Sequence, residues 1–163
     1  MLIGVMADTH DNLTLIEKAV SFFNEQKADF VIHAGDFVAP FSLGPLENLR
    51  CPWIGVFGNN DGEKAGLTKS SQGRIQPPPF ELNLDGKKVV VVHDLEEFDT
   101  KELLESGAEI IVYGHSHESK VEMMDKTLLI NPGEVGAWLS GRSTVVLLDT
   151  KTMEAHTKDL ETD

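Results

Sequence analysis

The sequence is short of cysteine, of positive charge and of long apolar runs. Its one cysteine, Cys51, excludes an internal disulfide framework and a cysteine-rich zinc site. Pro52 and an apolar segment follow, which favours a buried free thiol over a nucleophile. No apolar run approaches the roughly 18 residues of a membrane span, and the segment from Met1 to Ala7 lacks the basic start of a signal peptide. We therefore expect a soluble, cytoplasmic protein that does not enter a membrane.

Lysine and arginine number 14 against 27 aspartates and glutamates, so the formal net charge of the 163 residues is -13. Because clusters of basic residues supply affinity for a phosphate backbone, this balance argues against binding of long nucleic acids. The acidity either serves solubility or includes carboxylates that hold metal ions. No Gly-x-Gly-x-x-Gly follows the first apolar run and no Walker-type Gly-Lys-Ser/Thr occurs, which disfavours nucleotide cofactors.

The first sixty residues alternate predicted strands and helices, as in an α/β fold. Three short apolar runs are typical of strands covered on both faces: Leu2 to Ala7, Phe30 to Ala34 and Trp53 to Phe57. Two helices are predicted between them: one capped by Asp11 or Asn12 with an apolar stripe of Leu13, Ile16, Val20 and Phe23, and a short one over Pro40 to Leu49.

The remaining chain is rich in predicted hairpins. They pair Phe80 to Leu84 with Lys88 to Val92 across Asp85-Gly86, Val121 to Met123 with Leu128 to Ile130, and Ser143 to Leu148 with Met153 to Lys158. A capping box at Asp99 and Glu102 predicts a helix through Ser106 that ends at Gly107, and Ile110 to Tyr113 is a buried strand. No repeat, linker or low-complexity segment interrupts the chain, so we expect one domain over residues 1–163.

The segment from Gly62 to Gln76 has no clear periodicity. It carries Lys64, Lys69 and Arg74 and is either a mobile loop that meets an anionic substrate or a solvated connection.

Polar residues stand where the predicted strands stop, at the carboxyl ends at which α/β folds bind ligands. These candidates are Asp8, His10, Asp36, Asn59, His93, His115 and His117. If the backbone stays extended, a period of two places His115 and His117 on one side. Oxygen and imidazole donors without a thiolate suit two borderline divalent ions. Two such ions activate a water and clamp an in-line displacement at phosphorus, so we predict hydrolysis of a phosphate ester.

Five motifs carry a resemblance to a known family: Asp-x-His, Gly-Asp, Gly-Asn-x-Asp, a lone histidine after a strand, and Gly-His-x-His, in this order. The set resembles the calcineurin-like metallophosphoesterase superfamily. The small size and the loop Asn131-Pro132-Gly133 are similar to its compact prokaryotic phosphodiesterase branch. The resemblance runs from Asp8 to about Arg142. It implies a four-layer αββα sandwich, in which two mixed β-sheets are flanked by helices, with a dinuclear site at one edge.

The resemblance also implies roles. One ion would be held by Asp8, His10, Asp36 and His117, and the other by Asp36, Asn59, His93 and His115, with Asp36 bridging. The implied catalytic residues are Asp36, Asn59, Asn60 and His93, and a metal-bridging hydroxide would be the nucleophile. The expected enzyme is a metal-dependent phosphoric ester hydrolase, a phosphodiesterase acting on small phosphate esters. Manganese is the preferred ion, with nickel, iron and zinc as alternatives, and a homo-oligomer stays open.

Three residues depart from the family pattern. Asn60 stands where many members have a histidine; it can donate a hydrogen bond to a phosphoryl oxygen but cannot supply a proton near neutral pH. Asp94 replaces a common glycine and either orients an imidazole or caps a loop, and we favour the loop. Glu134 replaces a common serine after Asn-Pro-Gly, a change that the sequence does not explain.

Other polar residues have weaker claims. His33 lies behind the site or is a satisfied core histidine, which we favour, and His156 is expected on the surface. Asp61 is expected to orient its loop rather than bind metal. Arg142 reaches either a phosphate or a surface salt bridge.

Two other functions compete with the enzyme. The same family fold serves as a protein-interaction scaffold in the retromer subunit, where degraded ligand positions accompany loss of efficient catalysis. A passive metal-binding or sensor protein is the third option. Because competent residues occupy every expected ligand position here, the sequence favours the enzyme.

Overall fold

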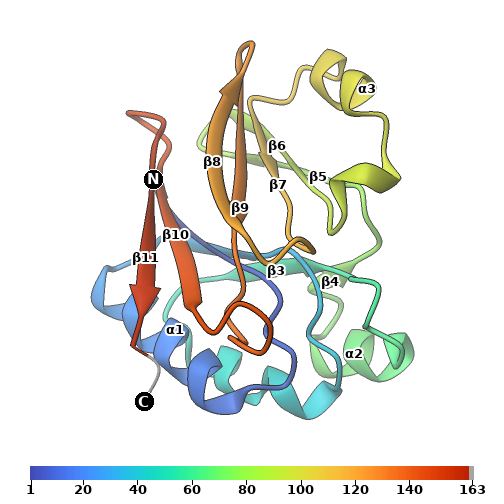
Figure 1. The fold of residues 1–163 in the computed structure, drawn as a ribbon, viewed down its shortest axis with the longest axis vertical. Coiled ribbons are helices and arrows are strands. Elements are labelled where there is room, and N and C mark those ends of the chain that lie inside the picture. The colour runs from blue at the N-terminus through green and yellow to red at the C-terminus, as the bar shows by residue number, and fades with distance from the viewer. Residues whose placement is uncertain (162–163) are drawn as a thin grey trace.

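The computed structural model describes residues 1–161, and in it two β-sheets lie between layers of helices (Figure 1). The helical elements are α1 (Leu13–Glu25), η1 (Pro40–Asn48), α2 (Lys64–Ser70), η2 (Leu95–Glu97) and α3 (Thr100–Glu105), where η1 and η2 are 3-10 helices. The strands are β1 (Leu2–Met6), β2 (Phe30–His33), β3 (Trp53–Val56), β4 (Ile75–Gln76), β5 (Phe80–Leu84), β6 (Lys87–Val91), β7 (Ile110–Val112), β8 (Ser119–Met124), β9 (Thr127–Pro132), β10 (Ser143–Asp149) and β11 (Glu154–Leu160).

The first sheet contains six strands in the order β11-β10-β1-β2-β3-β4. Strands β1 to β4 run parallel, with Val5 opposite Ile32 and His33 opposite Gly55, while β10 pairs antiparallel with β1. The carboxyl ends of β1, β2 and β3 therefore meet at one edge of this sheet.

The second sheet contains five strands in the order β5-β6-β7-β9-β8. Its three central strands, β6, β7 and β9, run parallel, and the outer strands β5 and β8 pair antiparallel with them. The loops that follow β6 and β7 carry the histidines predicted as ligands. Both sheets are mixed, as predicted.

Three apolar clusters separate the layers. One lies between the sheets and joins residues such as Ile3, Val5 and Ile110. A second packs α1, η1 and α2 on the outer face of the first sheet, and a third packs α3 on the second sheet. Figure 1 shows α1 and α2 on one side of the molecule and α3 on the other. The arrangement is the expected four-layer sandwich.

The apolar runs form strands in which side chains on opposite faces pack into different clusters. In β1, Ile3 and Val5 enter the cluster between the sheets, whereas Met6 enters the helix-side cluster. Both faces are covered, so the run contains no exposed position that would have to be polar.

Several local predictions were wrong. The segment from Gly62 to Gln76 contains α2 and β4 rather than an irregular loop. In the predicted stripe of α1, Leu13 is 39% exposed, whereas the other three residues are buried as predicted. The buried residues of α1 are Leu15, Ile16, Ala19, Val20 and Phe23. Asn131 and Pro132 belong to the end of β9 rather than to a loop.

The terminal hairpin, the Asp85-Gly86 hairpin and the Asp99 cap were predicted correctly. The Asp99 side chain accepts the N–H groups of Lys101 and Glu102 at the start of α3. Cys51 is a free thiol, but it is only partly buried. Within residues 1–161, no helix is long and apolar enough to cross a membrane.

Candidate metal centre

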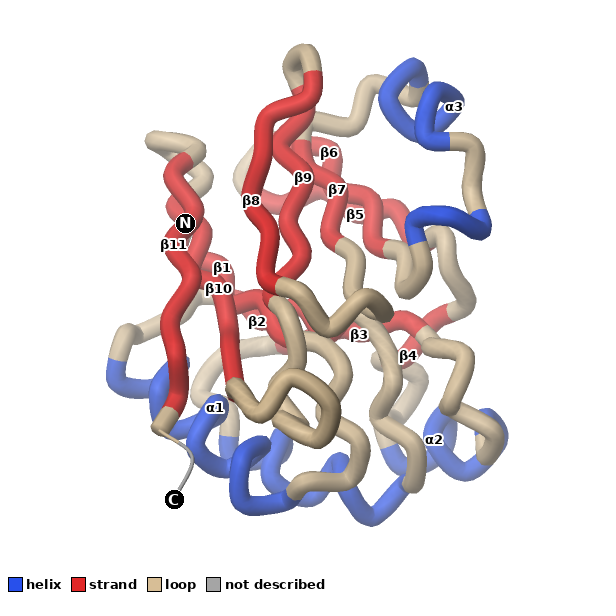
Figure 2. Tube along the Cα trace, in the orientation of Figure 1, coloured by secondary structure: helices blue, strands red, loops and turns tan. Residues whose placement is uncertain are grey.

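Loops that follow five strands bring the predicted ligands together where the two sheets approach each other. In the tube view these loops occupy the space beside the ends of β2, β3, β8 and β9 (Figure 2). The residues come from the loops after β1 (Asp8, His10), β2 (Asp36), β3 (Asn59), β6 (His93) and β7 (His115, His117).

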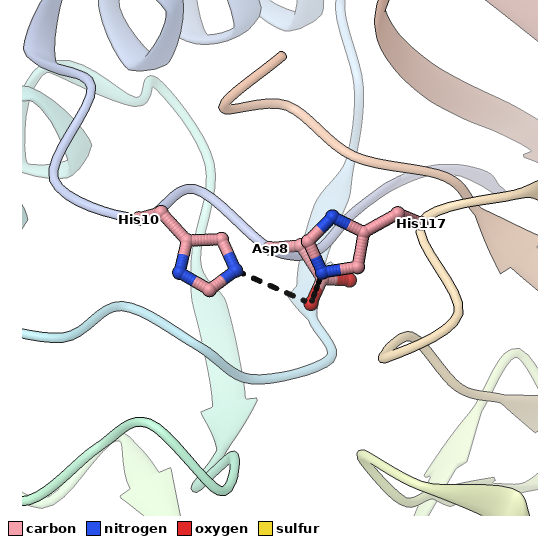
Figure 3. Close-up of side chains that lie close together, drawn as sticks. All are labelled: Asp8, His10 and His117. Atoms are coloured by element: carbon pink, nitrogen blue, oxygen red, sulfur yellow. Dashed lines mark ion pairs between the residues drawn. The ribbon is translucent and has the colours of Figure 1, made fainter. Parts of the chain in front are cut away.

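One group of donors is centred on Asp8. The Oδ1 atom of Asp8 lies 3.8 Å from Nε2 of His10 and 3.5 Å from Nε2 of His117. Figure 3 shows the two imidazoles reaching this carboxylate from separate loops. The rings stack with their centres 5.2 Å apart. The other oxygen of Asp8 accepts the backbone N–H of His115 at 3.1 Å, which fixes the orientation of the carboxylate.

A second group is centred on Asn59. Its Oδ1 atom lies 2.9 Å from Nε2 of His93 and 3.0 Å from Nδ1 of His115. The Nδ1–H of His93 donates to the carbonyl of Ala34 at 2.7 Å. This bond turns Nε2 toward the site, as the outer hydrogen bond of a metal-ligating histidine does.

Asp36 lies between the two groups. Its Oδ2 atom is 3.5 Å from Nε2 of His10 and 3.4 Å from Nε2 of His93. The backbone and side-chain N–H groups of Asn60 donate to its two oxygens, each at 2.8 Å. One carboxylate thus faces imidazoles of both groups.

The donors fit divalent ions. Asp8, His10 and His117 form one set, and Asp8, Asp36 and His93 another, each with ligand atoms within 4.8 Å of one another. Oδ1 of Asp8 and Nε2 of His10 are buried without a hydrogen-bond partner, which costs roughly 1–3 kcal/mol each unless something binds them. Two ligands held by one ion at about 2.1 Å lie roughly 3.0–3.4 Å apart, close to the separations found here.

The electrostatics favour a charged cluster. Burial would raise the pKa of Asp36, but the adjacent His93 and Asn60 hold this pKa well below its usual value. Burial would lower the pKa of His93, but the Asp36 carboxylate raises it to about 9. The Asp8 carboxylate raises the pKa of His10. A proton on His93 therefore balances part of the negative charge that metal ions would otherwise balance.

The backbone at the site is strained. Five candidate ligands have φ between 41° and 68°: Asp8, His10, Asp36, His115 and His117. This left-handed region costs a non-glycine residue on the order of 1 kcal/mol or more. The backbone is therefore not extended through His115 and His117, which was the condition for placing both rings on one side. Their rings diverge, with His115 turned toward Asn59 and His117 toward Asp8.

Two glycines let the chain pass directly behind the carboxylates. A Cβ atom on Gly58 would lie 2.1 Å from Oδ1 of Asp36, and one on Gly114 would lie 2.8 Å from Oδ2 of Asp8. Neither position leaves room for a side chain without moving a candidate ligand.

Asp61 orients the Asn59 loop, as predicted. Its buried carboxylate accepts three backbone N–H groups, from Gly58 at 2.7 Å, Val38 at 2.7 Å and Asp36 at 3.1 Å. It joins two loops that are separate in the sequence, and burial raises its pKa.

His33 is the satisfied core histidine that we favoured. Its Nδ1 accepts the N–H of Gly35 at 3.2 Å, so its Nε2–H faces the Thr9 hydroxyl at 3.1 Å, and that hydroxyl donates to the carbonyl of Asp36. Burial lowers the pKa of His33 to about 3, so the ring is neutral.

Asp94 caps a loop, as favoured, and also lies near a candidate ligand. One oxygen accepts the N–H of Glu96 at 2.9 Å and caps η2, which confirms the favoured prediction. The other oxygen lies 3.4 Å from Nε2 of His115, so Asp94 also contacts a candidate ligand.

Glu134 is a residue whose role we missed. Its fully buried carboxylate accepts the backbone N–H groups of Trp138, Leu139 and Ser140. Its Oε2 lies 3.2 Å from Nδ1 of His117, although the pair does not meet hydrogen-bond geometry. The only sequence signal was its departure from the family serine.

Two adjoining hollows open beside the candidate ligands. One, of about 470 Å³, is lined by His10, Asp11, Val38, Asn60, His117, Trp138 and Leu139. The other, of about 440 Å³, is lined by Asp36, Asn60, His115, Ser116, His117, Glu118, Leu139 and Ser140. Neither lining, among residues 1–161, includes a lysine or arginine. The volumes suit a small molecule.

The remaining candidates lie elsewhere. Arg142 pairs with Asp159 on the surface, and Arg74 stacks on Trp53 and pairs with Glu47. His156 is exposed in β11, as expected. Asn12, not Asp11, caps α1.

Known proteins match nearly the whole chain. A model of the calcineurin-like phosphoesterase superfamily domain matches residues 1–153. The phosphodiesterase MJ0936 of Methanocaldococcus jannaschii is 37% identical over 159 residues, which cover 94% of this chain and 96% of that protein.

Solved structures of other proteins share this fold. The structure described as a novel archaeal phosphodiesterase aligns with a TM-score of 0.88 and 35% identity, over 98% of this chain and all 100% of that one. Yfce, a phosphoesterase from E. coli, aligns with a TM-score of 0.72 over 99% of this chain and 100% of its own, and at 18% identity it supports the fold alone. The chain therefore belongs to the calcineurin-like phosphoesterase superfamily.

Proposed function

We propose that this protein is a metal-dependent phosphodiesterase that hydrolyses small phosphate esters at a dinuclear centre. The observation that carries the proposal is the position of Asp36, whose Oδ2 atom lies within 3.5 Å of imidazoles from both donor groups. The 37% identity to a phosphodiesterase supports the same reaction class.

In this proposal Asp8, His10, Asp36 and His117 hold one divalent ion, and Asp36, Asn59, His93 and His115 hold the second. Such a pair of ions, when bound, supplies an activated water nucleophile and charge neutralisation of the phosphoryl group. All donors are nitrogen or oxygen, which supports Mn²⁺ as the first choice and Ni²⁺, Fe²⁺ or Zn²⁺ as alternatives.

In this proposal Asn60 contacts the substrate. Asn60 lines both hollows, and its amide donates one N–H to Asp36. The second N–H of this amide can donate to a phosphoryl oxygen, but it cannot protonate a leaving group near neutral pH. We therefore expect rates to depend steeply on the leaving group, with aryl esters hydrolysed faster than alkyl esters.

The charge of the hollows supports a diester. Because no lysine or arginine lines them in the described chain, positive charge near the substrate comes from histidines and bound ions. A diester carries one negative charge and a monoester up to two, so the diester needs less neutralisation. The proposal includes a single domain over residues 1–163, a cytoplasmic location and no binding of long nucleic acid, and it leaves self-association open.

The test is hydrolysis of bis(p-nitrophenyl) phosphate and p-nitrophenyl phosphate by metal-stripped protein, with Mn²⁺ or Ni²⁺ added back. Asp36→Asn and His115→Ala are expected to lose metal-restored turnover. His156→Ala, which removes an exposed histidine from β11, is the matched control. Preference for the monoester would contradict the diester assignment. Absence of turnover in protein that binds two ions would contradict the enzyme and favour a scaffold or sensor.

A further inference from the structure

The loop between β9 and β10 carries two large apolar side chains beside the candidate metal centre. It runs from Gly133 to Arg142 and curls in the lower centre of the view (Figures 1 and 2). Trp138 is 65% exposed and Leu139 is 78% exposed. Exposed apolar residues in such a place need an explanation, because they line the hollow that contains His10 and His117.

Hydrogen bonds hold this loop in its conformation. The buried carboxylate of Glu134 accepts the N–H groups of Trp138, Leu139 and Ser140 from inside the curl. The loop also pairs with the chain that leads from β1 into the site, since the N–H of Val135 donates to the carbonyl of Ala7 and that of Gly136 to the carbonyl of Asp8.

The indole of Trp138 is fixed as well. Its Nε1–H donates to the carbonyl of His10 at 3.0 Å, which ties the ring to a candidate ligand's backbone. Asn12, the cap of α1, donates from its side-chain amide to the carbonyl of Gly136 at 2.9 Å. The ring is therefore oriented by bonds to its edge while most of its surface faces solvent.

Leu139 extends this apolar wall. It lines both hollows, whereas Trp138 lines only the larger one. The larger hollow is also lined by His10, His117 and Asn60, so a molecule that fills it contacts both polar and apolar groups. Ligand sites typically combine these two features.

We propose that Trp138 and Leu139 form a subsite for a flat aromatic group of the substrate, a nucleobase or an aryl ring, next to the phosphoryl group. The inference rests on the proposed phosphodiesterase function and names its substrate class. An aromatic ring stacked on Trp138 places its phosphate toward the histidines, within one hollow.

The exposed area favours a small ligand over a second protein chain. A large aromatic side chain buries about 150–250 Å², whereas a stable interface needs roughly 800 Å² from each partner. Two neighbouring side chains fall short of that area but match the face of one aromatic ring.

The experiment compares two pairs of ligands that differ only in the ring. Phenylphosphonate and methylphosphonate have carbon–phosphorus bonds and are not hydrolysed as esters. Adenosine 5′-monophosphate and ribose 5-phosphate form the second pair, which separates a nucleobase from a simple aryl group. Affinities are measured by calorimetry with the Mn²⁺-loaded protein, and as inhibition constants against bis(p-nitrophenyl) phosphate.

We expect the ligand with a ring to bind wild-type protein about tenfold more tightly than its partner, the size of one stacking contact. Trp138→Ala and Leu139→Ala should reduce this ratio toward one. Trp138→Phe keeps a ring but loses the bond to His10, so it should retain most of the ratio. Met123→Ala removes another exposed apolar side chain, from β8, and should leave the ratio unchanged.

Fluorescence gives a readout that is independent of turnover. The chain has two tryptophans, and Trp53 is only 3% exposed, so solvent-exposed emission comes from Trp138. We expect phenylphosphonate, but not methylphosphonate, to change this emission in wild-type protein and to leave Trp138→Phe unaffected.

Three outcomes would overturn the subsite. Equal affinities within both pairs, with hydrolysis and methylphosphonate binding intact, would refute it while the proposed function survives. Self-association that is lost in Trp138→Ala, with an unchanged ring preference, would assign the loop to an interface between copies. If the protein neither binds the two phosphonates nor hydrolyses the diester, the proposed function and the subsite are refuted together.

Discussion

Glu134→Gln tests whether one buried carboxylate supports both the loop and the metal centre. The carboxylate accepts three backbone N–H groups and lies 3.2 Å from Nδ1 of His117. Glutamine has nearly the same shape but keeps only one acceptor oxygen. If this oxygen faces Trp138 and Leu139, the amide NH₂ faces the N–H of Ser140 and the imidazole.

The expected magnitudes follow from these contacts. Hydrogen bonds to a charged group contribute about 1.5–3 kcal/mol each, and neutral ones about 1 kcal/mol. Losing the Ser140 bond and weakening the other two should lower the free energy of unfolding by about 2–4 kcal/mol. Losing the carboxylate beside His117 should weaken binding of Mn²⁺ about 10–100-fold, as for other partners of metal-ligating histidines.

Chemical denaturation of metal-free protein followed by circular dichroism measures the first effect, and calorimetric titration with Mn²⁺ measures the second. Glu118→Gln is the matched control, because it removes the same charge from an exposed residue that lines a hollow beside the site. Equal losses of affinity in the two variants would assign the effect to net charge. Unchanged Mn²⁺ affinity in a destabilised Glu134→Gln would refute the role of the His117 contact.

Three further predictions test the surroundings of the site. Gly58→Ala should displace the Asp36 carboxylate and lower Mn²⁺ affinity at least tenfold in a titration, whereas Gly62→Ala, where the added Cβ meets no atom within 4 Å, should have little effect. Asp94→Asn should keep the η2 cap but bind Mn²⁺ a few-fold more weakly. Asp94→Ala should bind Mn²⁺ more weakly too, and denaturant titration should show a loss of about 1 kcal/mol in its free energy of unfolding. Equal free energies of unfolding in the two variants would contradict the cap. Burial lowers the pKa of His33 from 6.5 to about 3, so between these pH values the unfolded chain binds a proton that the folded chain does not. As the pH decreases from 6.5, the free energy of unfolding should therefore decrease by up to about 1.4 kcal/mol per pH unit. An equal slope in His33→Gln would refute this prediction.

Much of the site could be predicted because its residues directly follow apolar strands. In the first sheet Asp8 and Asp36 follow the parallel strands β1 and β2, and in the second sheet His93 and His115 follow the parallel strands β6 and β7. Parallel neighbours end at the same edge of their sheet. Local sequence therefore places residues of the same sheet near one another, whereas the packing of the two sheets brings Asp36 next to His93. The assignment of each donor to one ion remains a prediction of the proposed function.

The missed helix α2 illustrates what a local pattern cannot provide. Of its seven residues only Leu67 is buried, so no apolar stripe distinguishes it from a loop. It contains Gly66, which has no side chain and therefore lets α2 approach Pro40 of η1: a Cβ atom there would lie 2.8 Å from Cγ of Pro40. Short helices of this kind depend on tertiary packing rather than on propensity, and this packing is not readable along one segment.

The left-handed turns of the ligands were missed for a related reason. Sequence patterns predict the low-energy backbone, and residues such as His115 and His117 rarely adopt positive φ on their own. The strain persists because distant groups hold the turns: the N–H of His115 donates to Asp8, which is 107 residues away, and the N–H of Asp36 donates to Asp61, 25 residues away. Each bond needs the complete fold, so a list of donors in sequence order cannot reveal it. The buried carboxylates of Asp61 and Glu134 act in the same way, since they bind loop backbone and thereby position the candidate ligands. In this chain a residue that makes the site rigid can have a clear sequence signal, as Asp61 has, or a weak one, as Glu134 has, and substitution of either residue should separate metal affinity from the identity of the ligands.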